Sequence, residues 1–121
     1  MHGLGDLEAA VMDVLWRAEE PVRVREVLDR LDTGRKLAYT TVMTVLDNLH
    51  RKRWVDRELQ GKAYVYRPAL RREEAAARAL REVLDASGDP RAVLLHFVEN
   101  VSDEETDLMR AALRRKRIRR R

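Results

Sequence analysis

The apolar positions of residues 39–53 recur with the spacing of a single helix face. Val42, Val45, Leu46 and Leu49 follow the i, i+3, i+4, i+7 pattern of an amphipathic helix. The opposite face is polar but mostly short: Thr40, Met43, Thr44, Asp47, Asn48 and Arg51. Short side chains allow a helix to approach another surface closely, and the triplet Arg51-Lys52-Arg53 follows at its end. This pattern is typical of a helix that enters a DNA groove beside the phosphate backbone.

Two further helices are predicted ahead of this one. Asp6 is the expected N-cap of the first, whose apolar face holds Leu7, Ala10, Val11, Val14 and Leu15 and which ends before Pro21. Residues 22–32 have the helical period through Val24, Val27, Leu28 and Leu31, and Thr33-Gly34 is the expected end of that helix. A short basic turn, Arg35-Lys36, then leads into the helix predicted over residues 39–53. Two helices joined by a short turn, the second with a polar free face, form a helix-turn-helix arrangement.

The pattern changes to strands after Arg53. Residues 54–59 and 63–67 are rich in β-formers, and Gln60-Gly61-Lys62 between them indicates a hairpin turn. Tyr64 and Tyr66 alternate with Val65, so one face of that strand is expected to be exposed. Three helices followed by a hairpin describe a winged helix over residues 1–70, closed by Pro68, with the hairpin tip as the wing.

Residues 71–121 are predicted to form three more helices and no strand. Ser87-Gly88-Asp89-Pro90 interrupts the first of them, with Asp89 as N-cap of the next, and Ser102-Asp103-Glu104-Glu105 is a capping box for the last. An isolated domain of about 50 residues is marginally stable, and residues 93–98 are apolar on more faces than one neighbouring helix can cover. We therefore expect a dimerisation domain that uses Leu80, Leu84, Val93, Leu94, Phe97, Val98, Leu108, Met109 and Leu113. The fold class is mainly α with a small β-hairpin.

Composition narrows the classes of function. The 121 residues include no cysteine, which excludes disulfides and thiolate metal sites. No apolar run reaches the roughly 18 residues of a membrane span, and no signal peptide is evident, so a soluble cytoplasmic protein is expected. The three histidines lack ligand spacing, and neither a nucleophile beside a base nor a glycine-rich phosphate loop is present. We expect no enzyme, no cofactor and no metal.

The positive charge is unevenly distributed. Residues 1–70 hold 12 Lys and Arg against 11 Asp and Glu, residues 71–109 hold 5 against 10, and residues 110–121 hold 8 against none. The basic end has two interpretations: a solubilising tail, or an extension of the last helix that adds salt-dependent affinity for DNA. The second is favoured.

The candidate DNA contacts each have an ordinary structural alternative. The threonines could be plain surface residues, Met43 could belong to the core, and Tyr39 could either pack under the helix or bind a phosphate. Asp47 would repel phosphates, so a salt bridge to a neighbouring arginine or a solvent position is expected. Arg51, Lys52 and Arg53 could merely complement the helix dipole. Trp16 and Trp54 are expected in the core.

Taken together, these segments resemble the penicillinase-repressor family of bacterial transcription regulators, the BlaI/MecI type. The resemblance rests on Asp6-Leu7-Glu8 with residues 11–16, on residues 39–46, on Tyr64-Val65-Tyr66 and on residues 95–99, in this order and spacing. It extends from about Leu4 to Arg114. It implies a homodimeric winged-helix repressor whose N-terminal domain binds an inverted-repeat operator in double-stranded DNA.

The resemblance also implies particular residues and partners. The DNA-binding positions it gives, together with the basic helix end and wing, are Tyr39, Thr40, Thr41, Met43, Thr44, Asn48, Arg51, Lys52, Lys62 and Tyr64. In the family a membrane sensor of β-lactams triggers cleavage of an Asn-Phe bond, and His96–Phe97 is the matching bond here. A copper-sensing branch uses C-terminal cysteines, which this chain lacks.

Two other functions remain open at this point. A winged helix that serves as a protein-docking module would not bind duplex DNA. An RNA-binding winged helix would prefer structured RNA, although few exposed aromatic residues are available for stacking.

Overall fold

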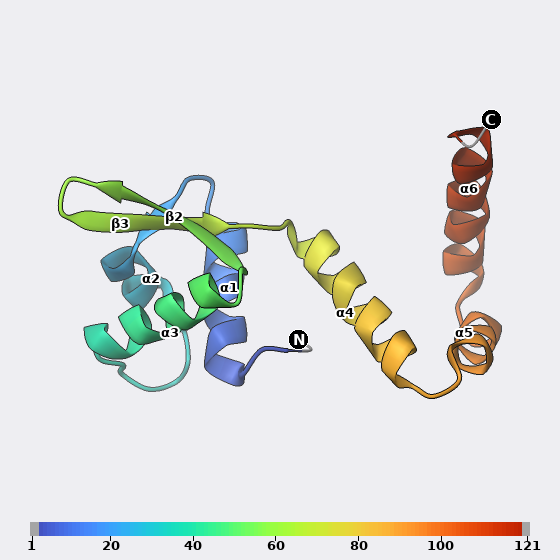
Figure 1. Cartoon of the computed structure of the whole chain (residues 1–121), viewed down its shortest axis with the longest axis horizontal. Helices are drawn as coiled ribbons and strands as arrows, with labels where there is room; N and C mark the ends of the chain where they lie inside the picture. The colour runs from blue at the N-terminus through green and yellow to red at the C-terminus, as the bar shows by residue number, and fades with distance from the viewer. Residues whose placement is uncertain (1–2, 120–121) are drawn as a thin grey trace. The chain divides into compact units, whose positions relative to one another are not determined.

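The computed structural model describes residues 3–119, which form a mainly helical chain with a small antiparallel sheet (Figure 1). In chain order the elements are α1 (Asp6–Arg17), β1 (Val22–Arg23), α2 (Val24–Arg30), α3 (Tyr39–Arg51), β2 (Val55–Gln60), β3 (Ala63–Pro68), α4 (Arg72–Ala86), α5 (Pro90–Glu99) and α6 (Asp103–Arg119). This confirms the predicted fold class of a winged helix followed by three helices.

The chain divides into two compact units. The first extends to Ala79 and contains α1–α3, the sheet and the first half of α4, and the second begins at Leu80. In the first unit α3 packs against α1 and α2, and β2 and β3 form a long ribbon that extends past the helices (Figure 1).

The sheet has three strands in the order β1-β3-β2, all antiparallel. The predicted hairpin is present, but Gln60 is the last residue of β2 and pairs with Ala63, so only Gly61 and Lys62 form the turn. Gly61 has a φ of +65°, which a residue without a Cβ adopts at no steric cost.

Strand β1 corrects the prediction of one helix over residues 22–32. Val22 pairs with Tyr66 and Arg23 pairs with Val65, so these two residues are extended and the helix starts at Val24. Hydrophobic periodicity could not show this, because a two-residue strand exists only through its partner on β3.

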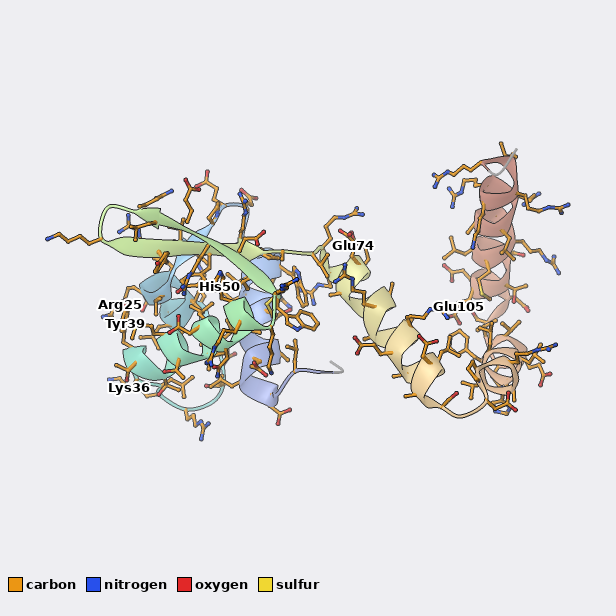
Figure 2. All side chains as sticks on the ribbon, in the orientation of Figure 1. Arg25, Lys36, Tyr39, His50, Glu74 and Glu105 are labelled. Atoms are coloured by element: carbon orange, nitrogen blue, oxygen red, sulfur yellow. The ribbon has the colours of Figure 1, made fainter. Side chains whose placement is uncertain are left out.

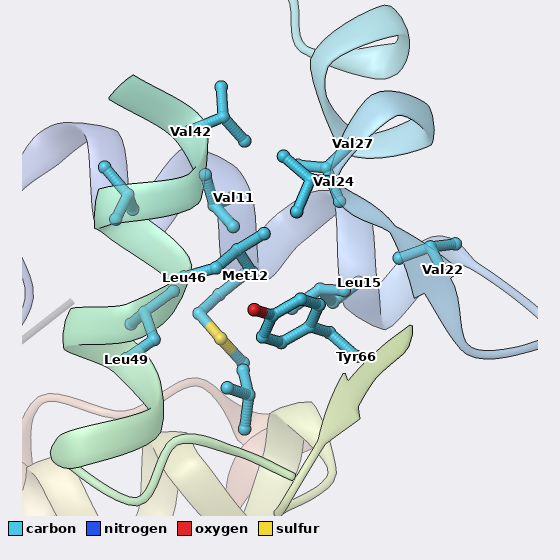
Figure 3. Packing of buried hydrophobic residues seen from close by; sticks show 12 residues of the cluster. Val11, Met12, Leu15, Val22, Val24, Val27, Val42, Leu46, Leu49 and Tyr66 are labelled. Atoms are coloured by element: carbon cyan, nitrogen blue, oxygen red, sulfur yellow. The ribbon is translucent and has the colours of Figure 1, made fainter. Parts of the chain in front are cut away.

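The core of the first unit is aliphatic apart from one tyrosine. The apolar face predicted for α3 is fully confirmed, since Val42, Leu46 and Leu49 are 0% exposed and Val45 is 8% exposed. Figure 3 shows the ring of Tyr66 beside Met12 and Leu15 of α1. The buried cluster consists of Val11, Met12, Leu15, Val22, Val24, Val27, Val42, Val45, Leu46, Leu49, Val55 and Tyr66.

Several helix ends differ from the prediction. The N-cap of α1 is Gly5 and not Asp6, because Glu8 reaches back to accept a hydrogen bond from the Gly5 amide at 3.0 Å. Helix α2 ends at Arg30 with Leu31 as C-cap, so Gly34, at φ +74°, lies in the following loop. By contrast, the capping box of α6 is confirmed: Ser102 Oγ accepts from the Glu105 amide at 3.1 Å, and Glu105 accepts from the Ser102 amide at 3.0 Å.

The start of α4 is attached to α1 by polar and aromatic contacts. Trp16 Nε1 donates to the Leu70 carbonyl at 2.9 Å, and Arg72 binds Asp13 at 2.8 Å. The Arg72 guanidinium also lies 5.0 Å from the centre of the Trp16 ring, and Ala75 is 1% exposed. Trp16 and Trp54 pack edge to face on the core, as expected, although both are only partly buried.

The second unit leaves its apolar side chains partly or largely exposed. Within residues 80–119, which end where the described part of the chain ends, no side chain is buried. Phe97 is 54% exposed, Leu94 50% and Leu108 65%. None of the helices between residues 3 and 119 combines the length and apolar character needed to cross a bilayer.

Candidate nucleic-acid interface

The free face of α3 carries the residues predicted to read DNA. Thr40, Thr41, Met43 and Thr44 are all exposed, because the buried residues of the helix lie on its other side. Met43 is 39% exposed, so it lies on the surface rather than in the core. The Thr44 hydroxyl donates its proton to the Thr40 carbonyl at 2.9 Å, and its oxygen keeps lone pairs that can accept a hydrogen bond. Such an acceptor suits the amino group of adenine or cytosine in a major groove.

The first residues of α2 and α3 meet beside this face. The Arg25 guanidinium lies 5.0 Å from the centre of the Tyr39 ring, and Figure 2 shows the two residues close together. Tyr39 is 39% exposed, so part of its ring reaches the surface beside Arg25. Sequence reasoning missed Arg25, since its position near a helix start became visible only once β1 had displaced that start to Val24.

Arg57 joins α3 to the wing. Its Nη1 binds Asp47 Oδ1 at 3.0 Å, and its guanidinium lies 4.2 Å from the centre of the Tyr64 ring. Arg57 also hydrogen-bonds the Tyr66 hydroxyl, although burial still raises the pKa of Tyr66 above its ordinary value. The expected salt bridge of Asp47 is thereby confirmed, and Asp47 no longer presents an unpaired negative charge to a phosphate.

A groove lies between α3 and the wing. Its lining residues come from β1, α2, α3 and both strands of the hairpin: Arg23, Val24, Arg25, Tyr39, Met43, Asp47, Arg57, Lys62, Ala63, Tyr64 and Tyr66. Thus the structure brings together Tyr39, Met43, Lys62 and Tyr64 from the predicted set. It adds Arg23, Arg25 and Arg57, which no local sequence signal marked.

The exposure of side chains along β3 does not alternate between the two faces of the strand. It differs instead between the outer end of the hairpin and its base. Tyr64 is 40% exposed, whereas Val65 and Tyr66 are 6% and 1% exposed although they point to opposite faces. The expectation that one face of the strand is exposed is therefore wrong. The reason is that the base of the ribbon packs on the core, while its outer end extends beyond the helices (Figure 1).

The basic end of α3 is engaged in contacts within the protein. Arg51 donates to the side-chain oxygen of Asn48. Lys52 Nζ lies 2.8 Å from Glu8 Oε1 and 3.0 Å from Glu8 Oε2, so it connects the end of α3 to the start of α1. Lys52 thus differs from Lys62, which lies at the wing tip and has no acidic partner among residues 3–119.

The described chain offers no metal-binding cluster. Within residues 3–119 no group of three or more His, Asp or Glu side chains could hold an ion.

A family model and two relatives of known name are similar to this chain over most of its length. Residues 4–115 match the model of the penicillinase repressor family. Two relatives named transcriptional regulator BlaI, from the CDC 1551/Oshkosh and H37Rv strains of Mycobacterium tuberculosis, are 46% identical over 113 residues, which is 91% of this chain and 82% of theirs.

Solved structures share the fold at low sequence identity. A probable transcriptional regulator from Pseudomonas aeruginosa has a TM-score of 0.52 at 19% identity, covering 94% of this chain and 79% of that one. A mutant of MepR from Staphylococcus aureus, bound to an oligodeoxyribonucleotide, has a TM-score of 0.50 at 15% identity, covering 98% and 80%. On the match over residues 4–115 and the 46% identity, the chain belongs to the penicillinase repressor family, whose members are transcriptional regulators and not enzymes.

Proposed function

We propose that this protein is a homodimeric transcriptional repressor that binds an inverted-repeat operator in double-stranded DNA. The observation that carries the proposal is the exposed face of α3, where short side chains adjoin a groove bordered by Arg25 and Lys62. A major groove accepts one α-helix, and the two cations lining the adjoining groove can contact phosphates that border it.

Each side chain on this face has a distinct role in the proposal. Thr40, Thr41 and Thr44 contact base edges, and Met43 packs on a thymine methyl. Asn48, Arg51 and Lys62 contact phosphates, with Tyr39 and Tyr64 beside them. Lys52 joins them only when it leaves Glu8, so its contribution to affinity is smaller than that of Lys62.

The dimer is proposed from the uncovered helices of the second unit. Its apolar side chains (Leu80, Leu84, Val93, Leu94, Phe97, Val98, Leu108, Met109 and Leu113) find no buried place within the described chain. A second copy would cover them, and a two-fold dimer presents two reading helices to a palindromic site. We propose a location in the bacterial cytoplasm, because that is where the protein would act on DNA.

Release from DNA is proposed to follow cleavage between His96 and Phe97 in a pathway that a membrane sensor of β-lactams controls. Both residues lie in α5, so that helix must unfold locally before a protease can accept the bond. Loss of α5 would weaken the dimer and hence the hold on an operator. Mass spectrometry of the protein from β-lactam-treated cells should find fragments that end at residue 96, and an intact chain would oppose this route.

Selection from a random duplex library tests the central proposal. Purified protein should enrich an inverted repeat whose half-sites lie about 10 base pairs apart, or a multiple of this, centre to centre. Enrichment of a site without two-fold symmetry would contradict the dimeric mode. No affinity for duplex DNA would favour a protein-docking module, and preference for structured RNA in a parallel selection would favour the RNA-binding alternative.

A further inference from the structure

The last turns of α6 carry a dense group of cations. Arg110, Arg114, Arg115, Lys116, Arg117 and Arg119 are all exposed, and none forms an ion pair with another residue in the range 3–119. Elsewhere many cations have acidic partners, such as Lys52 with Glu8 and Arg72 with Asp13. The end of α6 is thus a concentration of positive charge that the protein itself leaves uncompensated.

The arrangement of these cations excludes ordinary helix packing. At 3.6 residues per turn, the side chains of residues 114–117 project in every direction around the helix. Ile118 is the one apolar residue between Arg114 and Arg119, and its side chain is 73% exposed. A partner helix could cover this segment only by removing water from arginines, which is costly. A solvated anion can bind it without that cost.

The charge pattern also disfavours the helix by itself. Arg110 and Arg114, and likewise Arg115 and Arg119, stand four residues apart, a spacing at which like charges repel on a helix. Cations suit the C-terminal end of a helix dipole, but that effect is confined to the last turn. Six exposed cations over ten residues therefore need a different explanation, and a polyanion that spans several of them supplies one.

The charge balance along the chain indicates which polyanion. Residues 1–70, which include the proposed reading surface, carry a net charge of only +1, and residues 71–109 carry −5. Association with DNA at ordinary salt depends largely on cations that displace counterions from phosphates. The twelve residues 110–121, with eight cations and no anion, contain the whole net positive charge of the protein.

We propose that the basic end of α6, residues 110–119, is a second DNA-binding site that contacts the phosphate backbone without reading sequence. This site rests on the proposed function for the identity of its ligand. It supplies affinity that the nearly neutral first unit lacks, while α3 supplies the discrimination between sequences.

The test uses the full chain with Arg114, Arg115, Lys116 and Arg117 all replaced by Gln. The matched control replaces Arg71, Arg78, Arg81 and Arg91 by Gln, which removes the same charge from α4, α5 and the residue before α4. Fluorescence anisotropy would measure binding to a random-sequence duplex and to a selected operator at several salt concentrations. The variant with the four replacements at residues 114–117, the tail variant, should bind the random duplex at least about tenfold more weakly than the parent at low salt.

The salt dependence of DNA binding should also differ between the tail variant and the parent. If the four cations contact two phosphates, the slope of log affinity against log salt should become shallower by about 2. The ratio of operator to random-duplex affinity should stay unchanged, and the control should retain most of its affinity and slope.

Three results would overturn the second site. An equal loss in the control would show that only net charge matters. Conversion of the tail variant to a monomer in light scattering would assign the cations to the dimer contact. Tighter binding of the parent to vesicles containing phosphatidylserine than to duplex DNA would assign them to a membrane surface.

Failure of the second DNA-binding site can be distinguished from failure of the proposed repressor function. If no operator is ever selected, the repressor proposal fails, but salt-dependent binding of random duplex that requires the tail would still establish the second site.

Discussion

At the scale of single residues, α3 has a buried face that stabilises the fold and an exposed face that we propose contacts DNA. Leu46 is 0% exposed within the core, whereas Met43, three residues earlier, is 39% exposed on the groove. Replacement by alanine should therefore reduce stability at Leu46 and reduce DNA binding at Met43.

Leu46→Ala should lower the free energy of unfolding by about 2–5 kcal/mol, because it leaves a cavity in a packed core. Met43→Ala should change stability by roughly 0.5 kcal/mol or less and instead weaken operator binding by about tenfold, the value of a lost base contact of about 1–2 kcal/mol. Urea denaturation and anisotropy on the same samples measure both quantities. Equal stability losses would mean that Met43 is a core residue.

At the scale of elements, two ion pairs join α3 to other parts of the first unit, in addition to its buried apolar face. Arg57 connects the middle of α3 to the wing, and Lys52 connects its end to the start of α1. Lys62, at the wing tip, is a further basic position, and within residues 3–119 it has no acidic partner that would compete with a ligand.

Lys62→Ala should weaken binding to every DNA sequence alike and reduce the salt slope by about 1 for each copy that contacts DNA, because one phosphate contact is lost. Arg17→Ala is a suitable control, since Arg17 is an exposed cation that ends α1 and pairs with Asp13. Affinities over a salt series check the expectation. An unchanged slope would show that the wing does not reach the backbone.

The Glu8–Lys52 pair should make stability depend on pH. Burial acts to raise the pKa of Glu8, but hydrogen bonds from Lys52 and the Gly5 amide, with the charge of Lys52, lower it below its ordinary value of 4.5. The pair therefore stabilises the fold fully above that ordinary value, and the gain is lost as pH falls through the lowered pKa.

Glu8→Gln should cost about 1 kcal/mol or less at pH 7, a small value because Lys52 is 47% exposed, and the cost should shrink below pH 4.5. Urea unfolding of the variant and the parent at several pH values measures it. Arg30→Gln, which breaks the exposed pair with Glu26, provides the comparison for an ordinary surface contact. A difference that grows toward acid pH would contradict the assignment.

At the scale of the whole molecule, the proposed dimer would form through the exposed apolar side chains of the second unit. One reading helix contacts only half of a palindrome, so two linked copies gain affinity from a high effective concentration. Phe97, 54% exposed in α5, is the largest apolar side chain that such a contact would cover.

Phe97→Asp should convert the dimer to a monomer, because a buried unpaired carboxylate is strongly unfavourable. Operator affinity should fall by about 100-fold or more, the scale of lost avidity. Light scattering at micromolar protein gives the mass, and Arg91→Gln, which changes the charge of the same helix by the same amount, is the control. A parent protein that is already monomeric would refute the dimer.

The sequence alone predicted the elements whose signals are local. The buried face of α3, the capping box at Ser102 and the order of helices and hairpin follow from apolar spacing and from side chains three or four residues apart, which act within one element. The family resemblance, confirmed by the comparisons, came from the order of these same segments.

Only the tertiary structure decided the contacts between distant residues. Strand β1 exists because Val22 meets Tyr66, Asp47 is neutralised by Arg57, and Lys52 is held by Glu8, 44 residues away. Arg25 joined the site only when the chain brought it over Tyr39. Periodicity reports which face of an element is apolar, but the partner that meets each polar side chain depends on how separate elements pack.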